Sequence, residues 1–586
     1  MATLRKSINT NSLMRLAAIV GGGAALFAAA QTENVALVVG LFLAVVLGFM
    51  ALVWRQSKLE AQKAVWDDFR TVNQNELALA NGRPNLYPDG VRYMDRQHPY
   101  SGDLDIFGPS SVFALVNRCA TPTANDLLAA WLSAPANRQT ILSRQLAVGE
   151  LAADTAWCQR FQSNLLFNLK QGTDFKQQFA RFLEGGDTLE GKWLRGYVKV
   201  VPWLMALVTG LAVFWPAFVP VAVFLALAHL FTAMAYGGRV GRIAGQVDRA
   251  GRMLGAFADS FEQMEHRRWE NEYGLALAGL LKAGAGSADK PVSVIFRELS
   301  AVIDRLDYRL NMLVGGVLNM VALWDFRQVF AVLDWRRQYG GRVLQALDVV
   351  AEVEALVSLA TLRRNHPQWV FPEVVPSPQP FVAATGLSHP LIAPQTAVPN
   401  DYTMDGHRVA LITGSNMAGK STFLRVIGTN AVLAFSGAPV CGSSMRLSVF
   451  HVVSYMRIAD SLNESTSTFK AELNRIEGVL RAVRTRPDTF FLIDEMLRGT
   501  NSKDKYLGSK AIIERLIADG GVGMVATHDL QLAKLAAEYP GLLANFHFDI
   551  QVQEGEMLFD YKLKPGECTI FNASLLLKNI GIDVAG

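Results

Sequence analysis

The stretch Gly414-Ser-Asn-Met-Ala-Gly-Lys-Ser-Thr422 fits the pattern G-x-x-x-x-G-K-[ST], which is typical of a loop that binds phosphate groups. The residues before it, Val409–Thr413, are apolar and β-prone and therefore predict a strand. The residues after it, 423–433, predict a helix. A strand, this loop and a helix in that order predict an α/β domain of the P-loop class.

The chemistry of phosphate binding explains the residue types in this loop. Glycines let the backbone curl so that successive N–H groups face phosphate oxygens, and the N-terminus of the following helix adds positive potential. We expect the Lys420 ammonium group to reach the β- and γ-phosphates of ATP and the Ser421 hydroxyl to bind Mg²⁺. The predicted nucleotide-binding residues are Gly414, Ser415, Asn416, Met417, Ala418, Gly419, Lys420, Ser421 and Thr422.

Two further apolar strands end in polar residues. Residues 489–493 lead into Asp494 and Glu495, which predicts that Asp494 holds Mg²⁺ and that Glu495 polarises the attacking water. An isolated Asp-Glu pair would indicate only a solvated strand end, but this pair follows a phosphate loop in the same domain. Residues 523–526 lead into Thr527 and His528, and we expect His528 to sense the γ-phosphate or to orient the water, although a strand-end histidine alone is more often structural.

Together these blocks resemble the ATPase domain of the MutS family, the DNA mismatch-repair ATPases related to ABC ATPases. The resemblance includes the Asn416-Met417 pair in the loop, the strand end at Asp494-Glu495 and the segment Ala526-Thr527-His528. It also includes Ser467 and Thr468, and the resemblance implies that these two residues reach the nucleotide of a partner subunit in a dimer.

The resemblance extends upstream and also has departures. Residues 111–135 are similar to the start of the family's helical core domain, and residues 386–401 are similar to the entry into its ATPase domain. No stretch resembles the family's mismatch-reading domain with its Phe-x-Glu wedge, which argues against direct reading of mismatches. Ser465, Leu497 and Lys505 stand where the family has glycine, and the family's adenine-stacking aromatic falls near Ala397.

Two apolar regions predict helical hairpins that cross a membrane. Residues 13–30 and 34–54 form the first, and residues 201–215 and 218–236 form the second, with Pro216 and Pro220 breaking the run. For the second region the alternative is a buried hairpin of a soluble domain, but the run is too uniformly apolar for that. Lys and Arg flank both hairpins and are missing from both turns, so the positive-inside rule predicts four spans with the ATPase domain and both termini in the cytoplasm.

The chain therefore divides into five predicted parts. They are a transmembrane hairpin (1–56), a helical core-like region (57–199), a second hairpin (200–237), a second helical core-like region (238–375) and the ATPase domain (376–586). A hydrophobic content of 51% with 18% charged residues suits a membrane protein with soluble parts, and four dispersed cysteines suggest neither a zinc site nor a disulfide framework. A net charge of +4 is too small to indicate nucleic acid by itself.

The sequence supports one leading function and leaves two alternatives open. The leading hypothesis is a membrane-anchored ATPase that uses ATP and Mg²⁺, acts as a homodimer with composite ATP sites and contacts membrane lipid. DNA binding and mismatch repair are implied by the family resemblance alone. One alternative is a membrane scaffold or transport-like ATPase whose nucleotide cycle moves the hairpins without DNA. The other is a slow ATP-binding switch.

Overall fold

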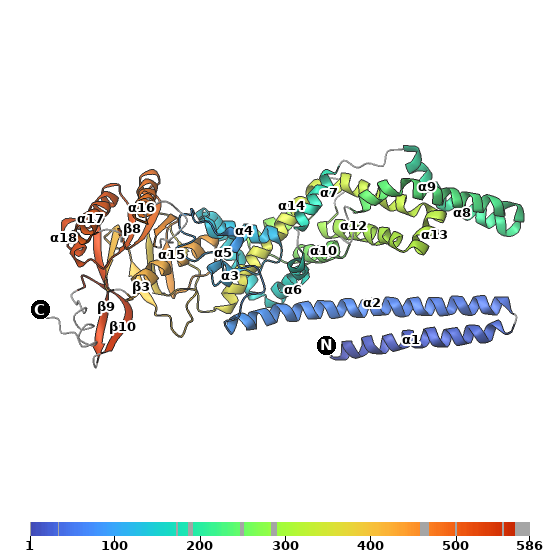
Figure 1. Ribbon diagram of the computed structural model, residues 1–586, viewed down its shortest axis with the longest axis horizontal. Coiled ribbons are helices and arrows are strands. Elements are labelled where there is room, and N and C mark those ends of the chain that lie inside the picture. The colour runs from blue at the N-terminus through green and yellow to red at the C-terminus, as the bar shows by residue number, and fades with distance from the viewer. Residues whose placement is uncertain are drawn as a thin grey trace. The chain divides into compact units, whose positions relative to one another are not determined.

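The structure is a computed structural model of the chain (Figure 1). It describes residues 2–32, 34–171, 174–185, 192–245, 251–282, 290–415, 417–456, 468–497, 501–553 and 556–568. The chain forms two compact units. One contains Met1–Pro84 and Gln159–Asn168, and the other contains Asn85–Cys158 and Leu169–Gly586.

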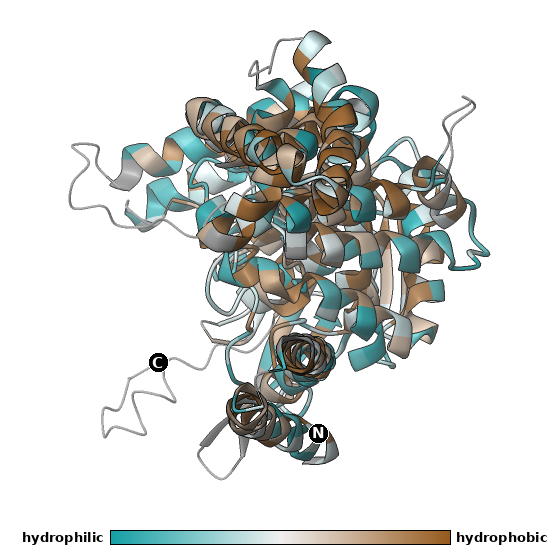
Figure 2. Cartoon of the chain, turned by 90° about the vertical axis from the view of Figure 1, so that its right-hand side faces the viewer, coloured by the Kyte–Doolittle hydropathy of each residue, from teal (hydrophilic) through white to brown (hydrophobic). Residues whose placement is uncertain are grey.

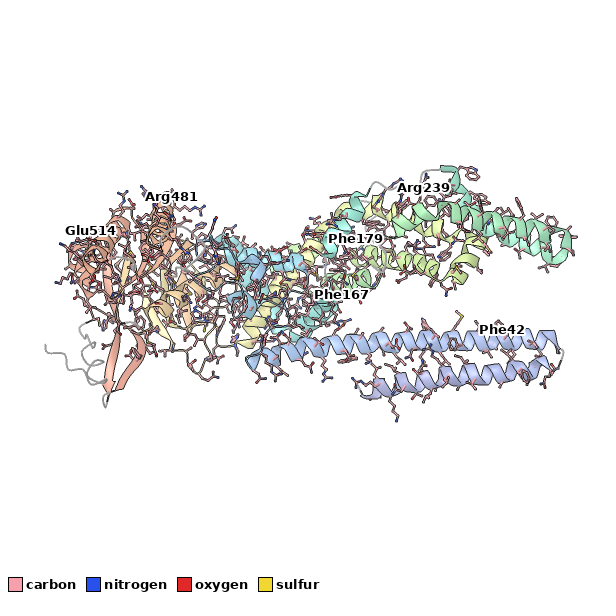
Figure 3. The ribbon with its side chains drawn as sticks, in the orientation of Figure 1. Phe42, Phe167, Phe179, Arg239, Arg481 and Glu514 are labelled. Carbon is pink, nitrogen blue, oxygen red and sulfur yellow. The ribbon has the colours of Figure 1, made fainter. Side chains whose placement is uncertain are left out.

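The first unit is built mainly from two long helices, α1 (Ala2–Ala30) and α2 (Val35–Ala80), which pack along each other. The Asn34 side chain caps α2 by accepting a hydrogen bond from the Leu37 N–H at 3.2 Å. The Asn11 amide on α1 donates to the Leu52 carbonyl and to the Gln56 side chain of α2, both at 2.9 Å. Most large apolar side chains of the pair are exposed, among them Phe42 (Figure 3).

The second of these helices is longer than the sequence analysis predicts. The sequence analysis predicts a span over residues 34–54 and a boundary after residue 56, whereas α2 continues without a break to Ala80. No proline or glycine occurs between residues 49 and 81, so nothing in the sequence interrupts the hydrogen-bond ladder.

Residues 85–365 are mostly helical, as predicted. Outside the second apolar hairpin the α-helices are α3 (Val112–Val116), α4 (Pro122–Ser133), α5 (Arg138–Ala153), α6 (Thr155–Leu165), α7 (Phe175–Glu184), α10 (Gly251–Glu265), α11 (Glu272–Leu281), α12 (Val292–Leu306), α13 (Met312–Ala322) and α14 (Trp324–Asn365). Short 3-10 helices are η1 (Val91–Tyr93), η2 (Leu166–Lys170) and η4 (Asp307–Leu310). Buried aromatic rings of α7, α10, α12 and α14 contact one another, stacked or edge to face, and they come from Phe175, Phe179, Phe257, Phe296 and Trp335.

The second apolar region forms α8 (Lys192–Phe214) and α9 (Val219–Gly245), separated by η3 (Pro216–Phe218). The predicted break at Pro216 is confirmed, because α8 ends at the residue before Trp215 and the prolines start the next turns. Among the described residues, four helices are long and apolar enough to cross a membrane: Thr3–Ala30, Gly40–Ala80, Trp193–Phe214 and Pro216–Gly245. Large apolar side chains are exposed on all four helices, and Figure 2 colours the hydrophobic residues of the chain brown.

The carboxy-terminal part is an α/β domain with two sheets. In the described residues, the large sheet has the order β10-β9-β4-β8-β7-β6, and only β10 is antiparallel to its neighbour. Its strands are β4 (Val409–Thr413), β6 (His451–Tyr455), β7 (Thr489–Asp494), β8 (Val522–Ala526), β9 (Leu543–Gln553) and β10 (Glu556–Pro565). The small sheet contains β1 (Glu373–Val374), β2 (Val382–Leu387), β3 (Asn400–Thr403) and β5 (Ser444–Leu447).

Helices cover the large sheet. They are α15 (Lys420–Ser436), α16 (Thr468–Thr485), α17 (Ser502–Ala518), η5 (Leu530–Lys534) and α18 (Leu535–Glu538). The strands β4, β7 and β8 are buried along their whole length, which explains their near-continuous apolar sequences. The predicted strands before the loop, before Asp494 and before Thr527 are therefore confirmed.

The helical part joins the α/β domain through polar contacts of the segment 99–105. Buried Asp103 accepts hydrogen bonds from the Ser454 hydroxyl at 2.7 Å and from the Arg475 guanidinium at 2.8 Å. Asp105 forms an ion pair with Arg425 of α15 at 2.7 Å. These contacts tie the helix that follows the phosphate loop to the helical part.

Inside the helical part, a fully buried carboxyl on α14 binds the start of α4. Glu354 accepts hydrogen bonds from the Ala120 N–H at 2.8 Å, from the Thr121 N–H at 3.3 Å and from the Thr121 hydroxyl. Burial raises the pKa of Glu354 from 4.5 to about 7, and the three donated hydrogen bonds oppose that shift in part.

Replacement of Glu354 by glutamine should flatten the pH dependence of stability. Because the folded-state pKa is the higher one, the folded chain binds more protons than the unfolded chain between pH 4.5 and about 7. This contribution is present below pH 4.5 and is lost as the pH rises through about 7; it amounts to on the order of 3 kcal/mol. The Tm of the detergent-solubilised chain should thus fall more steeply with pH in wild type than in Glu354→Gln, with the exposed Glu477→Gln as control. Equal slopes for all three proteins would contradict this.

Candidate functional site

The site is organised by the register of three parallel strands. Ile412 of β4 pairs with Ala526 of β8, and Ala526 pairs with Asp494 of β7. The backbone continues this alignment one residue further, because the Thr527 N–H donates to the Ile412 carbonyl and the Glu495 N–H donates to the Ala526 carbonyl, both at 3.0 Å. The loop after β4 and the carboxylates after β7 therefore meet at the same edge of the sheet, with β8 between them.

The loop between β4 and α15 has the backbone that its glycines predict. Gly414 has φ 143° and Gly419 has φ 108°, and Met417 also lies in the left-handed region with φ 69°. A Cβ atom on Gly414 would lie 2.7 Å from the Phe548 carbonyl oxygen. Gly419 is the N-cap of α15 and brings no side-chain cap, so its position leaves the first-turn N–H groups facing the loop.

Lys420 occupies the mouth of this loop. Its ammonium group donates to the carbonyls of Gly414 and Ser415, both at 2.7 Å, and the side chain is buried. Burial lowers the pKa of Lys420 from its ordinary value, and the nearby charges of Asp494, Glu495 and Cys568 counteract this shift. Two carbonyls thus hold the ammonium group over the loop. From this position it could donate hydrogen bonds to an anion bound in the loop.

The two carboxylates differ in their surroundings. Asp494 is the buried last residue of β7. Glu495 follows it with φ 60°, a conformation that costs a non-glycine residue roughly 1 to 3 kcal/mol and is typical of functional positions. This turn moves the Glu495 side chain out of the strand direction and toward β8.

Glu495, His528 and Lys505 form a cluster. His528 Nδ1 contacts Glu495 Oε1, and the Lys505 ammonium lies 3.3 Å from His528 Nε2 and 3.8 Å from Glu495 Oε1. Because an ammonium group can only donate, Nε2 accepts and the imidazole proton sits on Nδ1, where it is donated to Glu495. The structure thus brings His528 to Glu495, a contact that the sequence analysis does not predict, and its expected role of sensing the γ-phosphate or orienting the water stays a prediction.

A cavity of about 380 Å³ opens beside the loop. It lies between α15, β9, β10 and the segment 389–400, and its lining residues are His389, Ile392, Thr396, Ala397, Val398, Asn400, Gly419, Thr422, Phe423, Val426, Phe548 and Tyr561. Ala397 is at the place where the family resemblance puts a stacking aromatic, whereas aromatic rings enter the cavity from β9 and β10 instead.

Tyr561 is the aromatic residue that the sequence analysis missed. It lies at an irregularity in β10 with φ 51°, and Asn400 holds both sides of it by donating to the Tyr561 carbonyl and accepting from the Leu563 N–H. Its ring is within 3.2 Å of the position that a Cβ on Gly419 would take. The signal in the sequence was weak, because only the pairing of distant strands places residue 561 near residue 419.

The remaining predicted residues fall as follows. Ser421 and Thr422 are exposed in the first turn of α15, which is where a metal-binding hydroxyl is expected. Thr468 is the first residue of α16, and Asn416 and Ser467 lie outside the described residues. In the part of the chain that the structure describes, no group of three His, Cys, Asp or Glu side chains is placed to hold a metal ion. A site with Ser421 and Asp494 as protein ligands fits Mg²⁺, which usually keeps few protein ligands beside phosphate and water.

Three positions carry another residue where the resemblance places glycine, and the two that the structure describes have different surroundings. Leu497 keeps a left-handed backbone with φ 55°, and its buried side chain packs against Gly508. Lys505 instead adds a positive charge next to Glu495. Ser465 lies outside the described residues.

Comparison with known proteins identifies relatives of the α/β part. Residues 410–585 match the family described as MutS domain V. The chain is 32% identical over 226 residues to the DNA mismatch repair protein MSH3 of Phaeosphaeria nodorum, covering 37% of this chain and 20% of that protein. It is 32% identical over 264 residues to the DNA mismatch repair protein MutS of Thermus thermophilus, covering 44% of this chain and 30% of that protein. The chain therefore spans less than a third of the length of these relatives.

Two glycine substitutions should change stability in opposite directions. Gly414→Ala puts a Cβ against the Phe548 carbonyl at a left-handed φ, and we expect a loss of roughly 1 to 3 kcal/mol. Gly478→Ala, on an exposed face of α16 with open space around it, should stabilise the chain by roughly 0.5 to 1 kcal/mol. Thermal unfolding of the two purified variants tests this, and a Gly414→Ala protein as stable as wild type would show that the loop geometry is not constrained.

Proposed function

Because the chain belongs to the MutS family, we propose that it is a Mg²⁺-dependent ATPase related to the DNA mismatch-repair proteins. In this proposal it is anchored in a membrane by two helical hairpins and acts as a homodimer on DNA. The observation that carries the ATPase proposal is the shared edge of β4, β8 and β7, where a phosphate-type loop, Asp494 and Glu495 lie together.

Each residue at this edge has a task in the proposal. The N–H groups of the loop and of the first turn of α15 bind the phosphates, and Lys420 exchanges its two carbonyl partners for phosphate oxygens. Ser421 and Asp494 would hold Mg²⁺, and the bound ion would supply positive charge next to the phosphates. Glu495 accepts a proton from the attacking water, with His528 fixing the direction of its carboxylate.

The cavity beside the loop supplies a place for the nucleoside. Its lining includes Gly419 and Thr422 of the phosphate loop and α15, aromatic and aliphatic side chains, and the polar side chains of His389 and Asn400. Tyr561 offers a ring face for stacking on a base, which takes the place of the aromatic missing at Ala397.

The anchor follows from the length and surface of four helices. Each is at least as long as the roughly 20 residues that a bilayer core requires, and many of their large apolar side chains are exposed. Charges at the ends of both hairpins support a cytoplasmic position for the ATPase domain and both termini. We propose the same five parts that the sequence predicts: two membrane hairpins, two helical core-like regions and the ATPase domain. The names of the relatives support DNA as the macromolecular partner, and Ser467 and Thr468 are proposed to complete the site of a second subunit.

Hydrolysis by the purified chain in detergent tests the catalytic assignment. Glu495→Gln should lower kcat by at least about a hundredfold with ATP binding retained, because it removes the proton acceptor. Lys420→Ala should weaken ATP binding itself, and the exposed Glu477→Gln should match wild type. Duplex DNA should stimulate hydrolysis in wild type, and homoduplex and mismatched duplex should do so equally. Turnover that ignores DNA would overturn the repair-related part and favour a transport-like ATPase, whereas binding without turnover would favour a slow switch.

Substitution of Tyr561 tests the nucleoside cavity. Tyr561→Ala should weaken ATP binding about tenfold, because a base loses a stacking partner worth roughly 1 to 3 kcal/mol. Tyr561→Phe keeps the ring and should bind ATP as wild type does. Titration calorimetry with ATP and Mg²⁺ measures both affinities. Wild-type affinity in Tyr561→Ala would place the base elsewhere.

A further inference from the structure

The short helix α13 carries no charged side chain, unlike α12 before it and α14 after it. Residues 312–322 contain no Asp, Glu, Lys or Arg. The preceding α12 buries one apolar face and turns Arg297, Glu298 and Arg305 outward, as a helix on a soluble surface does. In α13 the outward residues are apolar, with Met312 86% exposed and Val317 60% exposed. A soluble surface rarely presents such a continuous apolar helix face.

Residues 307–323, which contain α13, form an excursion that starts and ends at the same place in the helical part. The Trp324 indole N–H, at the start of α14, donates to the Arg305 carbonyl near the end of α12 at 2.8 Å. The rings of Tyr308 and Trp324 stack with their centroids 6.3 Å apart. Gly315 allows α13 to fold back against the Arg309 backbone, since a Cβ there would lie 2.9 Å from the Arg309 Cα. Both ends of the excursion are thus on the same side.

One polar chain joins α13 to the second hairpin. His229, in the middle of α9, is buried and its Nε2 lies 2.7 Å from the Tyr197 hydroxyl of α8. Its Nδ1 lies 2.9 Å from the Met320 carbonyl of α13, so Nδ1 carries the proton and the hydroxyl donates to Nε2. Figure 1 shows α13 beside the core-side part of α8 and α9, the part of α9 that carries Arg239 in Figure 3.

The excursion and the helix on which it packs both expose large apolar side chains. Leu310, Met312, Val314, Val317 and Val321 are exposed on the excursion. Phe224, Leu227, Phe231 and Met234 are exposed on α9, which α13 contacts. An 11-residue helix is about 16 Å long and is too short to cross a hydrocarbon core of about 30 Å. A helix of this length, with both ends on one side, fits a segment that enters a membrane surface without crossing it.

We propose that residues 307–323 form a third membrane contact, in which α13 lies in the interfacial layer of the bilayer, packed on α8 and α9 with its apolar face against lipid acyl chains. This inference rests on the proposed membrane position of the second hairpin. Tyr308 and Trp324 take the place that aromatic residues prefer at a membrane interface, and Arg305 and Arg309 stand next to the head groups. The lipid is favoured over a protein partner because α13 packs on α8 and α9, two helices of membrane-spanning length whose large apolar side chains are also exposed.

Depth measurements on single labelled cysteines test the proposal in the full-length chain. The background is Cys441→Ser with Cys568→Ser, because Cys119 and Cys158 are buried and Cys441 and Cys568 are only partly covered. A polarity-sensitive fluorophore is attached in separate proteins at Val317→Cys on α13, at Phe224→Cys on α9 and at Leu146→Cys on α5, where Leu146 is 65% exposed. Each protein is reconstituted into vesicles of phosphatidylethanolamine and phosphatidylglycerol, with nitroxide-labelled lipid or aqueous iodide as quencher.

The label at Val317 should emit at a shorter wavelength than the label at Leu146 and should lose intensity to nitroxide lipid but not to iodide, as the label at Phe224 does. If Phe224 responds to lipid while Val317 responds to iodide, this inference fails and the membrane hairpin stands. If Val317 responds to neither quencher, a protein partner or a second copy covers α13 and the inference fails as well. If Phe224 itself responds to iodide, the proposed anchoring fails and the inference falls with it.

Discussion

The alignment of β4, β8 and β7 at one edge of the large sheet is the constraint on which the rest of the site depends. Ile412, Ala526 and Asp494 share one register, so the three parallel strands end at the same edge. The phosphate loop, Thr527 and the two carboxylates therefore lie close together although they are far apart in the sequence. The cost of this convergence appears in the backbone, where Glu495 and Leu497 take left-handed conformations directly after β7. The packing of three fully buried strands offsets that cost.

The long helix α14 connects the two ends of the second unit. Its first turns pack with α8 and α9 through Phe326, Val329 and Leu333, and its later part carries Glu354, which binds the start of α4. Helix α4 in turn contacts α15, the helix that begins at Lys420. A helix of 42 residues is about 63 Å long, so a rigid element runs from the base of the hairpin toward the nucleotide site. Packed helices, α4 and α14, thus lie between α15 and the second hairpin.

Local sequence patterns predicted the parts whose structure is decided locally. The loop, the three buried strands and the break at Pro216 follow from glycine, apolar runs and proline. The position of Tyr561 could not be predicted in this way, because it depends on the pairing of β9 and β10 and on Asn400 far away in the sequence. The sequence likewise predicts only a helical core-like region for the residues of α13. Apolar composition does not reveal which face of a helix its neighbours leave exposed.

The two replaced glycines after β7 separate the geometry of the site from its charge. At Leu497 the left-handed backbone survives without glycine because the side chain finds a buried place against Gly508, so the turn that positions Glu495 is kept. At Lys505 the replacement adds an ammonium group that contacts both Glu495 and His528. This ammonium group lies 3.8 Å from Glu495 Oε1, where it competes with water for the carboxylate oxygens. In the proposed function the loop and Lys420 bind the phosphates, whereas both replacements lie next to Glu495, the residue proposed to activate water. The two changes therefore bear on the proposed hydrolysis step and not on the proposed phosphate contacts.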